Sequence, residues 1–345
     1  MTQFHPLSGF FTYAPLRETL QNETLPEFAY VADLRLYCVQ SSFMPKGQLP
    51  LISIVTLNYN QEAITCAFLE STRKLKYPNY EILVCDMASN KNPTAAIESG
   101  TYPNTTVLVS KKNLGFAGGN NWGMRQSKGD FIFIVNNDTE VTPDLLDELI
   151  EAFDKDPRIG VTCPKIKYYS KPNIIQYAGF NPMNVYTGRT TSIGSMEEDK
   201  GQYNMSRLTS GAHGCAMMVK REIIDNVGMF AEKFFLYYEE WDWSARIRKA
   251  GYKIWYAASA EIYHKESLTI GKSNPIKVYY HTRNRILYMR RNSNIFQFSI
   301  FTLIFIFFIA PKTMTIYFFK KKFIHLRYFI KGIVWNLHTS SSSAV

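Results

Sequence analysis

Short apolar runs alternate along this chain with longer segments of helical periodicity. The runs, which we predict to be strands, lie at 51–59, 80–85, 106–109 and 131–135. The predicted helices between and after them lie at 61–75, 117–126 and 143–153. Runs without alternating polar residues are typical of strands buried on both faces, as in parallel sheets covered by helices. The sequence therefore predicts an α/β fold, with a doubly wound, mostly parallel sheet and helices on both faces.

Polar residues follow each predicted strand directly. They are Asn58-Tyr59-Asn60, Asp86, Asn113-Leu114-Gly115-Phe116 and Asn136-Asn137-Asp138. Asn and Asp favour turns, so each group alone also fits an ordinary strand end. The carboxyl ends of parallel strands meet at one edge of a sheet, where open α/β sheets bind their ligands. Four groups in succession favour a binding site at that edge.

The glycines of KNLGFAGGNNWG at 112–123 do not form a dinucleotide-binding fingerprint. Their spacing is not GxGxxG, and they follow the third predicted strand rather than the first. A GxxxxGK[ST] motif does not occur in the sequence either. These observations argue against a dehydrogenase and against a P-loop enzyme.

Five stretches in this order resemble the inverting family 2 glycosyltransferases of the GT-A fold. They are LNYN at 57–60, CDMASN at 85–90, NLGFAGGNNWG at 113–123, NNDTEV at 136–141 and FFLYYEEWDWSARIRKAGYKIWYAASAEIYH at 234–264. The resemblance covers about residues 50–291 and is greatest to the rhamnosyltransferase-like group that builds bacterial O-antigen and capsular polysaccharide. It implies that a nucleotide-sugar donor, a dTDP-rhamnose-like or UDP-sugar, lies across the strand ends.

The same resemblance implies which residues bind the donor and the metal. The donor residues are Thr56, Asn58, Asn60, Asp86, Asn113, Gly115, Asn120, Asn136 and Asn137, with Asp86 contacting the base. The family's acidic motif usually carries two or three carboxylates, whereas this chain keeps only Asp138. His264 falls where family members supply an imidazole to the metal. We therefore expect Asp138 and His264 to hold Mg²⁺ or Mn²⁺, which would stabilise the departing diphosphate as a Lewis acid.

Inversion also requires a general base, and three carboxylates stand together in YYEEWDW: Glu239, Glu240 and Asp242. By resemblance, Glu240 replaces the family's catalytic aspartate and is the expected base. Asp242 is the alternative, although its i,i+4 spacing from Arg246 predicts a pair on the helix surface. The cluster also fits an acidic first helical turn stabilised by the helix dipole. The resemblance places the acceptor region at Gly211, Tyr238 and Glu239.

The last part of the chain is apolar and flanked by basic residues. IFQFSIFTLIFIFFIA at 295–310 is followed by Pro311-Lys312 and then by TMTIYFF at 313–319. Basic residues flank these runs, namely Arg283, Arg285, Arg290 and Arg291 before them and Lys320, Lys321 and Lys322 after them. A spanning helix needs about 20 apolar residues, and one span would place one basic cluster outside, against the positive-inside tendency. We therefore expect a re-entrant or interfacial hairpin on anionic lipid, with a single transmembrane helix as the alternative.

These features predict the organisation and the cellular place of the chain. We expect an extension at 1–48 with one helix around 27–39, a catalytic domain at 49–291, a membrane-associating helical region at 292–338 and a disordered tail at 339–345. The five cysteines form no CxxC pair, so neither a zinc site nor a disulfide framework is indicated. No export signal is recognised at the N-terminus. The predicted location is the cytoplasmic face of the inner membrane, with a glycan or polyprenyl-diphosphate-linked acceptor.

Three other functions were compared with this interpretation. A sugar-phosphate nucleotidyltransferase typically has a glycine-rich, basic loop after the first strand, where this chain has NYNQEAIT. A nucleic-acid-binding protein would gather the net charge of +10 into one stripe on the folded domain, whereas much of it clusters beside the apolar tail. We therefore expect no nucleic-acid partner. An inactive, glycosyltransferase-like binding protein remains the third alternative, because both acidic motifs depart from the family pattern.

Overall fold

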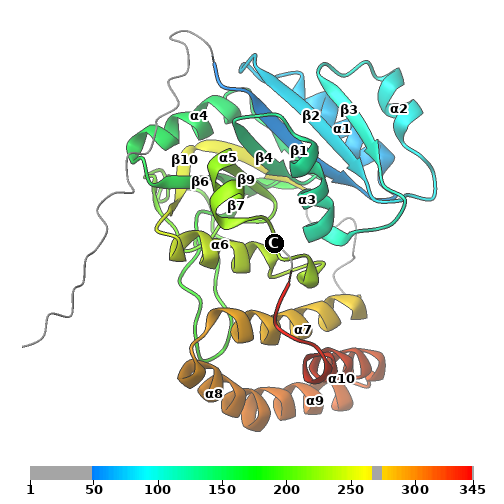
Figure 1. Cartoon of the computed structure of the whole chain (residues 1–345), viewed down its shortest axis with the longest axis vertical. Coiled ribbons are helices and arrows are strands. Elements are labelled where there is room, and N and C mark those ends of the chain that lie inside the picture. Colours follow the sequence, from blue (N-terminus) through cyan, green and yellow to red (C-terminus); the bar gives the residue numbers. More distant parts are fainter. Residues whose placement is uncertain (1–48, 266–273, 344–345) are drawn as a thin grey trace, which may run out of the picture. The chain divides into compact units, whose positions relative to one another are not determined.

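The computed structural model describes residues 49–265 and 274–343. The N-terminal extension at 1–48, with the helix predicted around 27–39, lies outside the described residues. Figure 1 shows a central sheet flanked by helices, followed by four helical segments at the C-terminal end of the chain. The alternation of strands and helices that the sequence predicts is present from residue 52 onward.

Ten strands form one mixed sheet in the described part of the chain. They are β1 Ile52–Asn58, β2 Tyr80–Asp86, β3 Thr105–Val109, β4 Phe131–Val135, β5 Thr139–Val141, β6 Ile159–Tyr168, β7 Lys171–Tyr177, β8 Arg207–Leu208, β9 Ala216–Lys220 and β10 Lys253–His264. The order is β3-β2-β1-β4-β9-β6-β10-β5, with β7 beside β6 and β8 beside β10. The strands β1, β2, β3, β4, β6 and β10 run in one direction, and the others run against them.

Helices cover both faces of this sheet. They are α1 Glu62–Thr72, α2 Thr94–Ser99, α3 Gly115–Gln126, α4 Leu145–Glu151, α5 Arg221–Val227 and α6 Glu239–Lys249, with short 3₁₀ turns η1 Ala152–Lys155 and η2 Glu232–Phe234. In the view of Figure 1, α3 lies in front of the sheet and α1 behind it. Because both faces are covered, β1 and β4 bury almost all of their side chains, including Ile52, Val55 and Phe133 at 0% exposure. The predicted α/β class is therefore confirmed.

The apolar run folds differently from the expected hairpin. The segments α8 Ile295–Ile304, η3 Phe305–Ile309 and α9 Ala310–Phe319 form one helix of 25 residues. Proline within a helix usually causes a break, because it lacks an N–H and its ring meets the carbonyl of the preceding turn. The π-helical turn η3 directly before Pro311 widens the helix there and lets it continue. The chain reverses at Lys320–Lys322 instead, and α10 Phe323–His338 follows.

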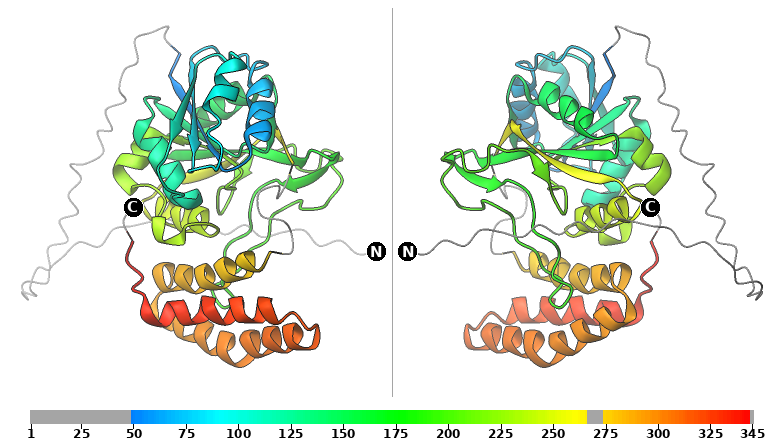
Figure 2. Two further views of the ribbon diagram at one scale, coloured as in Figure 1. Left: turned by 90° about the vertical axis from the view of Figure 1, so that its right-hand side faces the viewer. Right: turned by 90° about the vertical axis from the view of Figure 1, so that its left-hand side faces the viewer.

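The arginines before the apolar run also differ from expectation, because they hold the helices to the catalytic domain rather than facing lipid. They lie on α7 Pro275–Asn292. Arg283 donates to the carbonyls of Lys233 and Phe234, Arg290 donates to Asn336 O of α10, and Arg291 pairs with Asp242 of α6. Figure 2 shows α7 between the sheet domain and the last helices.

The serine-rich tail was expected to be disordered, yet its described part makes hydrogen bonds. Ser341 O accepts from Arg291, and Ser340 O accepts from Lys233 at 3.0 Å. Residues 340–343 therefore contact the catalytic domain, while 344–345 lie outside the described residues.

Candidate active site

The loops after β1 and β2 are joined by a buried polar network. Asn58 Nδ2 donates to Asp86 Oδ1 at 2.7 Å and to Ser89 Oγ at 3.2 Å. Ser89 Oγ and the Ser89 backbone N–H both donate to Asp86, and Thr65 Oγ1 donates to Asn58 Oδ1. Asn58 and Asp86 are each 1% exposed. Both side chains therefore order the two loops, and contact between Asp86 and a nucleotide base remains a prediction.

The other predicted donor residues divide into exposed and buried groups. Asn60 and Asn113 are exposed, and Asn113 Oδ1 accepts from the Gly115 N–H at 2.8 Å. Thr56 and Asn120 are buried at 0% and 1% exposure, and Asn120 donates to Phe116 O within its own helix. Burial therefore argues against direct donor contact by Thr56 and Asn120, which the resemblance had implied.

Glycine is required at position 115 by its backbone conformation and by the close approach of Phe235. Its φ is +70°, and a Cβ there would lie 2.5 Å from the carbonyl oxygen of Phe235. That carbonyl accepts from the N–H groups of Phe116 and Ala117 at the start of α3. The loop after β3 is thereby held against the segment that leads into α6.

The three residues directly after β4 are Asn136, Asn137 and Asp138, and Asp138 is the one carboxylate among them. Asn137 is buried and donates to Thr65 Oγ1 at 2.9 Å, whereas Asn136 is half-buried and its backbone N–H donates to Cys215 O. Asp138 is 5% exposed. Figure 1 shows β4 next to β1, so these residues follow the same edge of the sheet as Asn58 and Asp86.

Asp138 and His264 are brought together, although 125 residues separate them in the chain. The distance from Asp138 Oδ1 to His264 Nε2 is 3.2 Å, because His264 ends β10, which pairs with β5 directly after Asp138. The other ring nitrogen, Nδ1, donates to Gln176 Oε1 at 2.8 Å. This hydrogen bond fixes the ring so that Nε2 faces the carboxylate.

Such a pair fits a cation. Two lone pairs at 3.2 Å repel each other unless a proton or a metal ion lies between them, and Asp138 Oδ1 accepts no hydrogen bond from the described residues. Burial lowers the pKa of His264, but the Cys215 and Asp138 side chains raise it more, so the net shift is upward. Within residues 49–265 and 274–343, no three His, Cys, Asp or Glu side chains form a metal cluster. A divalent ion held by this pair would therefore take its remaining ligands from phosphate oxygens and water.

The segment before α6 is strained. Phe235, Tyr237 and Tyr238 have φ of 63°, 68° and 73°, a region that bulky residues rarely adopt. Strain of this kind persists where the surrounding structure enforces it, and it clusters at functional sites. Here it directs the first turn of α6, with Glu239 and Glu240, toward the space beside Gly214, because a Cβ on Gly214 would lie 3.9 Å from Glu240 Cβ. Gly214 precedes Cys215, whose carbonyl binds Asn136.

The three carboxylates of α6 have different surroundings. Asp242 is fully buried and binds Arg246 at 2.9 Å, Arg291 at 2.7 Å and Asn292 at 3.0 Å. The predicted pair with Arg246 exists, but it lies inside the protein rather than on the helix surface. Because its oxygens are engaged by these three groups, Asp242 has a structural role, which argues against the alternative base.

Glu239 and Glu240 lack such partners. One oxygen of each, Oε2, is buried without a hydrogen bond to the described residues. Burial and the neighbouring Glu240 raise the pKa of Glu239 well above its usual range. Burial, partly opposed by backbone hydrogen bonds, raises the pKa of Glu240 to about 7. Glu240 is thus poised to exchange a proton near neutral pH.

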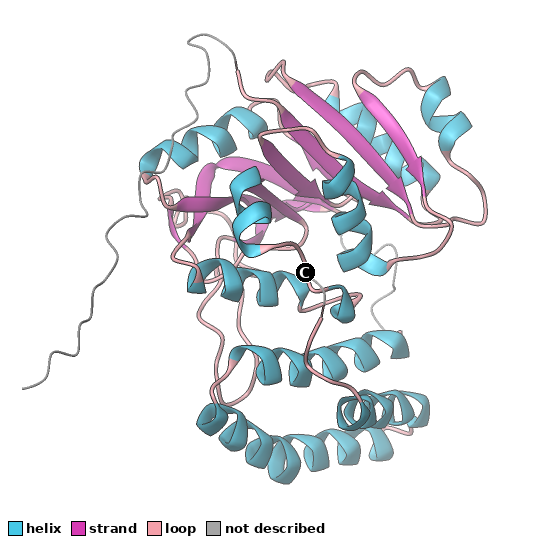
Figure 3. Ribbon diagram, viewed as in Figure 1, coloured by secondary structure: helices cyan, strands magenta, loops and turns pink. Residues whose placement is uncertain are grey.

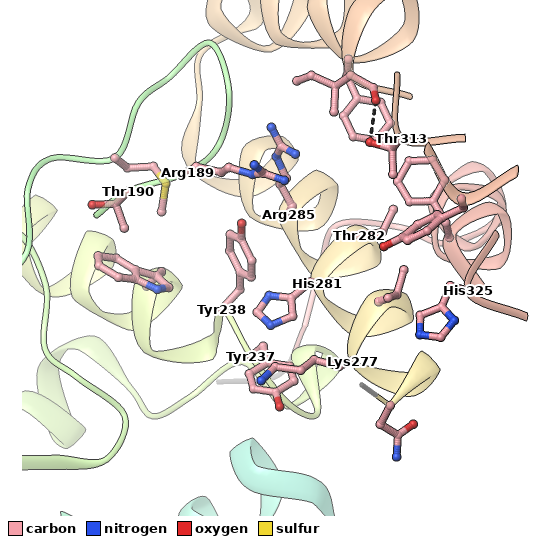
Figure 4. Close-up of a pocket in the computed structure, with 18 of the residues that line it drawn as sticks. Arg189, Thr190, Tyr237, Tyr238, Lys277, His281, Thr282, Arg285, Thr313 and His325 are labelled. Atoms are coloured by element: carbon pink, nitrogen blue, oxygen red, sulfur yellow. Dashed lines mark hydrogen bonds between the residues drawn. The ribbon is translucent and has the colours of Figure 1, made fainter. Parts of the chain in front are cut away.

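Glu240 also lines a pocket of about 660 Å³ between α6, α7 and the last helices (Figure 4). Trp241 of α6 and Tyr238, directly before α6, line it, and Tyr238 OH donates to Gly188 O at 2.9 Å. A Cβ on Gly211 would lie 2.7 Å from the Trp241 ring, so glycine allows that ring to pack there. Of the predicted acceptor residues, Tyr238 lines the pocket, Glu239 directly precedes Glu240 on α6, and Gly211 packs against Trp241. Their contact with an acceptor remains a prediction.

Several residues beside the Asp138–His264 pair and in the pocket next to Glu240 were not identified from the sequence. Gln176 lies on β7, in the stretch between 164 and 215, where the many turn residues gave no strand pattern that could be predicted. Arg189 comes from the same stretch. Lys277, His281 and Arg285 follow each other at i, i+4 and i+8 on α7, a spacing that puts them on one helix face. That spacing was visible, but the arginines of this region were interpreted as lipid contacts.

The family model described as Glycosyl transferase family 2 matches residues 53–228, or 176 of the 345 residues. The chain belongs to glycosyl transferase family 2. The matched residues include the loops after β1, β2, β3 and β4 and the whole of β9. His264 and α6 lie beyond the match, so their roles in this family 2 protein rest on the geometry above.

Relatives of this glycosyltransferase are distant in sequence. An uncharacterised protein of Sinorhizobium fredii, y4gI, is 28% identical over 260 residues, which are 72% of this chain and 28% of that protein. The N-acetylglucosaminyl-diphospho-decaprenol L-rhamnosyltransferase of Mycobacterium tuberculosis is 23% identical over 69% of this chain and 84% of that enzyme. The chain thus spans about a quarter of the first relative and most of the second.

A solved structure confirms the GT-A type of fold. The mannosyltransferase PcManGT from Pyrobaculum calidifontis, in complex with GDP-Man and Mn²⁺, matches with a TM-score of 0.54 at 14% identity. The match covers 85% of this chain and 88% of that one. The metal and the donor belong to that protein, and the likeness concerns the fold.

Proposed function

We propose that this family 2 protein transfers a sugar, with inversion, from a nucleotide-diphosphate donor to a hydroxyl group of a glycan acceptor. The observation that carries the proposal is the pairing of Asp138 with His264 at 3.2 Å beside the ends of the parallel strands. Two ligands for a divalent cation from distant parts of the chain, with an oriented imidazole, are typical of a built site rather than of a loop.

In this proposal the residues of the chain have separate roles. Asp138 and His264 would hold Mg²⁺ or Mn²⁺, which would supply a Lewis acid for the negative charge that develops on the diphosphate. Asn60, Asn113 and Asn136 offer amide groups to the donor from the strand ends. Gln176 keeps His264 Nε2 directed at the ion.

Glu240 is the proposed general base. Its unpartnered oxygen and its raised pKa allow it to take a proton from an acceptor hydroxyl near pH 7. Burial and the neighbouring Glu240 raise the pKa of Glu239 well above its usual range, which disfavours a second negative charge beside the base. Asp242 keeps α6 in place through its arginines.

The acceptor is proposed to be lipid-linked, in the synthesis of a cell-surface polysaccharide at the cytoplasmic face of the inner membrane. The relative from M. tuberculosis is named for a decaprenyl-diphosphate acceptor. The helix Ile295–Phe319 is long and apolar enough to cross a membrane, and it exposes Phe307 and Phe308 at 66% and 71%.

We propose that this helix lies in the membrane interface rather than spanning it. It runs alongside α10, which packs on α7, and the end of α10 is tied to the catalytic domain through Ser340. A helix held along a domain in this way presents one side to lipid. The exposed Lys320, Lys321 and Lys322 at its end fit anionic headgroups.

Donor binding tests the proposal directly. A panel of nucleotide sugars should raise the unfolding temperature of the full chain in the presence of Mn²⁺, because a ligand that binds only the folded state stabilises it. Asp138→Asn should remove the Mn²⁺-dependent part of the shift, whereas Glu98→Gln, at an exposed site on α2, should not change it. If no nucleotide sugar shifts the melting temperature, with or without Mn²⁺, the enzyme function is wrong.

A further inference from the structure

We propose that the pocket beside Glu240 binds the diphosphate of a lipid-linked sugar, with Arg189, Lys277 and Arg285 on the diphosphate. The proposal rests on the proposed function and names the chemical class of its acceptor. It also states where the acceptor's anionic group and its apolar chain lie.

Lysine and arginine side chains line this pocket from three parts of the chain, and one of them, Lys322, directly precedes α10. Lys277 and Arg285 belong to one face of α7, and Arg189 comes from the loop between β7 and β8. The loop is fixed against α7, since Arg285 donates to Thr187 O and a Cβ on Gly188 would lie 3.2 Å from Arg285 Cγ. Figure 4 shows Arg189 and Arg285 next to one another in the pocket wall.

Within the described part of the chain, the one carboxylate that lines the pocket together with these cations is Glu240. Arg285 is only 5% exposed, and its one hydrogen bond there is to a backbone carbonyl. No Asp or Glu of the described residues forms an ion pair with Arg189, Lys277 or Arg285, in contrast to the arginines that bind Asp242. Of the three, Arg285 is buried, and a buried charge without an ion-pair partner is costly. An anion with several acceptor oxygens would remove that cost.

The electrostatic effects inside the pocket agree with this charge imbalance. Burial and the neighbouring Arg189 lower the pKa of Arg285 to about 10. Withdrawal from bulk water, with the charges of Lys277 and Arg189, lowers the pKa of His281. The neutral imidazole then leaves the three cations to bind the anion, and arginine forms paired hydrogen bonds to phosphate oxygens.

The wall formed by η3, α9 and α10 combines apolar side chains with the polar Thr313, Tyr317 and His325. Phe305, Ile309 and Phe329 line it from η3 and α10, and Phe305 and Phe329 are about 5% exposed. On the same long helix, Ile306, Phe307 and Phe308 are exposed. A prenyl chain attached to the diphosphate can therefore follow this helix out of the pocket into lipid.

The position of Glu240 limits the size of the acceptor. Because Glu240 and the three cations line one pocket of about 660 Å³, the accepting hydroxyl belongs to a sugar close to the diphosphate. A long glycan would place its outer hydroxyl outside this space. The preceding reaction must therefore be the transfer of a sugar phosphate to a polyprenyl phosphate, or an early elongation of its product.

A binding experiment with farnesyl diphosphate tests this proposal without activity. The full chain in detergent is titrated in EDTA, so that no ion held by Asp138 and His264 can bind the probe. Arg189→Gln with Lys277→Gln should weaken binding by about tenfold or more, since each removes charge-assisted hydrogen bonds. Arg189 is exposed, so its replacement spares the fold. Arg248→Gln, at the exposed far end of α6, should leave binding unchanged.

Two further measurements distinguish a prenyl diphosphate from a phospholipid headgroup, and distinguish this proposal from the proposed function. Vesicles of phosphatidylglycerol should not displace farnesyl diphosphate, and displacement would assign the site to a phospholipid headgroup and overturn the proposal. Equal affinity of the double variant and the wild type would also overturn it. Binding of a nucleotide sugar with Mn²⁺ should be the same in both proteins, and its absence from both would instead contradict the proposed function while leaving the pocket assignment standing.

Discussion

The two polar regions of this protein differ in how their groups are satisfied. At the strand ends, Asn58, Asp86 and Asn137 bond to neighbouring side chains and leave little unused hydrogen-bonding capacity. In the pocket beside α7, Arg189 and Arg285 have no carboxylate partner among the described residues. The first region is pre-organised by the protein itself, whereas the second is completed only by a ligand. The comparison thus distinguishes polar residues that stabilise the fold from charged residues that we propose bind a substrate.

The largest expected effect follows from replacing the unpartnered carboxylate. Glu240→Gln should lower turnover by about two to four orders of magnitude, because it removes the general base while keeping the shape of the side chain. Nucleotide-sugar binding should stay close to that of the wild type. Glu98→Gln, at an exposed site on α2, is the matched control. Turnover retained in Glu240→Gln would move the base to another residue.

Asp242 provides the contrast on the same helix. Asp242→Asn should lower the free energy of unfolding by about 3 kcal/mol, because it leaves Arg246 and Arg291 without their buried counter-charge. Denaturant titration followed by tryptophan fluorescence measures the loss. The folded fraction should keep its turnover within a few-fold. A stable but inactive Asp242→Asn protein would reverse the roles of the two carboxylates.

Membrane attachment tests the exposed apolar side chains of the helix Ile295–Phe319. Replacing both Phe307 and Phe308 by Ser should weaken binding to anionic vesicles, by about 1.5 kcal/mol or more for each side chain. Both are exposed, so the fold should be unaffected. Met205→Ser, at 81% exposure in the catalytic domain, is the control. Undiminished flotation with vesicles would place the lipid contact elsewhere.

Gln176 tests whether the strand-end region is organised for a metal. Gln176→Leu should raise the Mn²⁺ concentration needed for half-maximal activity by about tenfold, because the imidazole of His264 loses the acceptor that fixes its orientation. Gln176→Glu keeps an acceptor oxygen and should restore most of the metal affinity. An unchanged metal requirement in Gln176→Leu would mean that His264 needs no such support.

The smallest effect is on pH dependence. Since burial raises the pKa of Glu240 to about 7, activity should increase as pH rises through 7 and the carboxylate forms. The folded protein binds this proton more tightly than the unfolded chain, so Glu240 makes stability fall with pH between about 4.5 and 7. Glu240→Gln should remove that contribution to the slope. A pH profile measured from 5 to 9, alongside melting curves, checks both signs.

Sequence reasoning was most successful where a pattern is local. The apolar run at 131–135 became β4 with the predicted bounds, since an uninterrupted run of five apolar residues is buried on both faces. The strands between 159 and 208 were missed, because turn residues and register shifts interrupt their periodicity there. Proline within a helix usually causes a break, which the π-helical turn before Pro311 avoids.

The sequence by itself determined the α/β class, the family and the order of polar groups along one sheet edge, because these depend on residues close together in the chain. Only the tertiary structure decided which charges find partners. It placed Arg291 on Asp242 and gave Arg285 no ion pair with a carboxylate of residues 49–265 and 274–343, although both arginines lie on the same helix. Charge pairing depends on which elements pack together, and that packing brings α6, α7 and the loop before β8 into contact from distant parts of the chain.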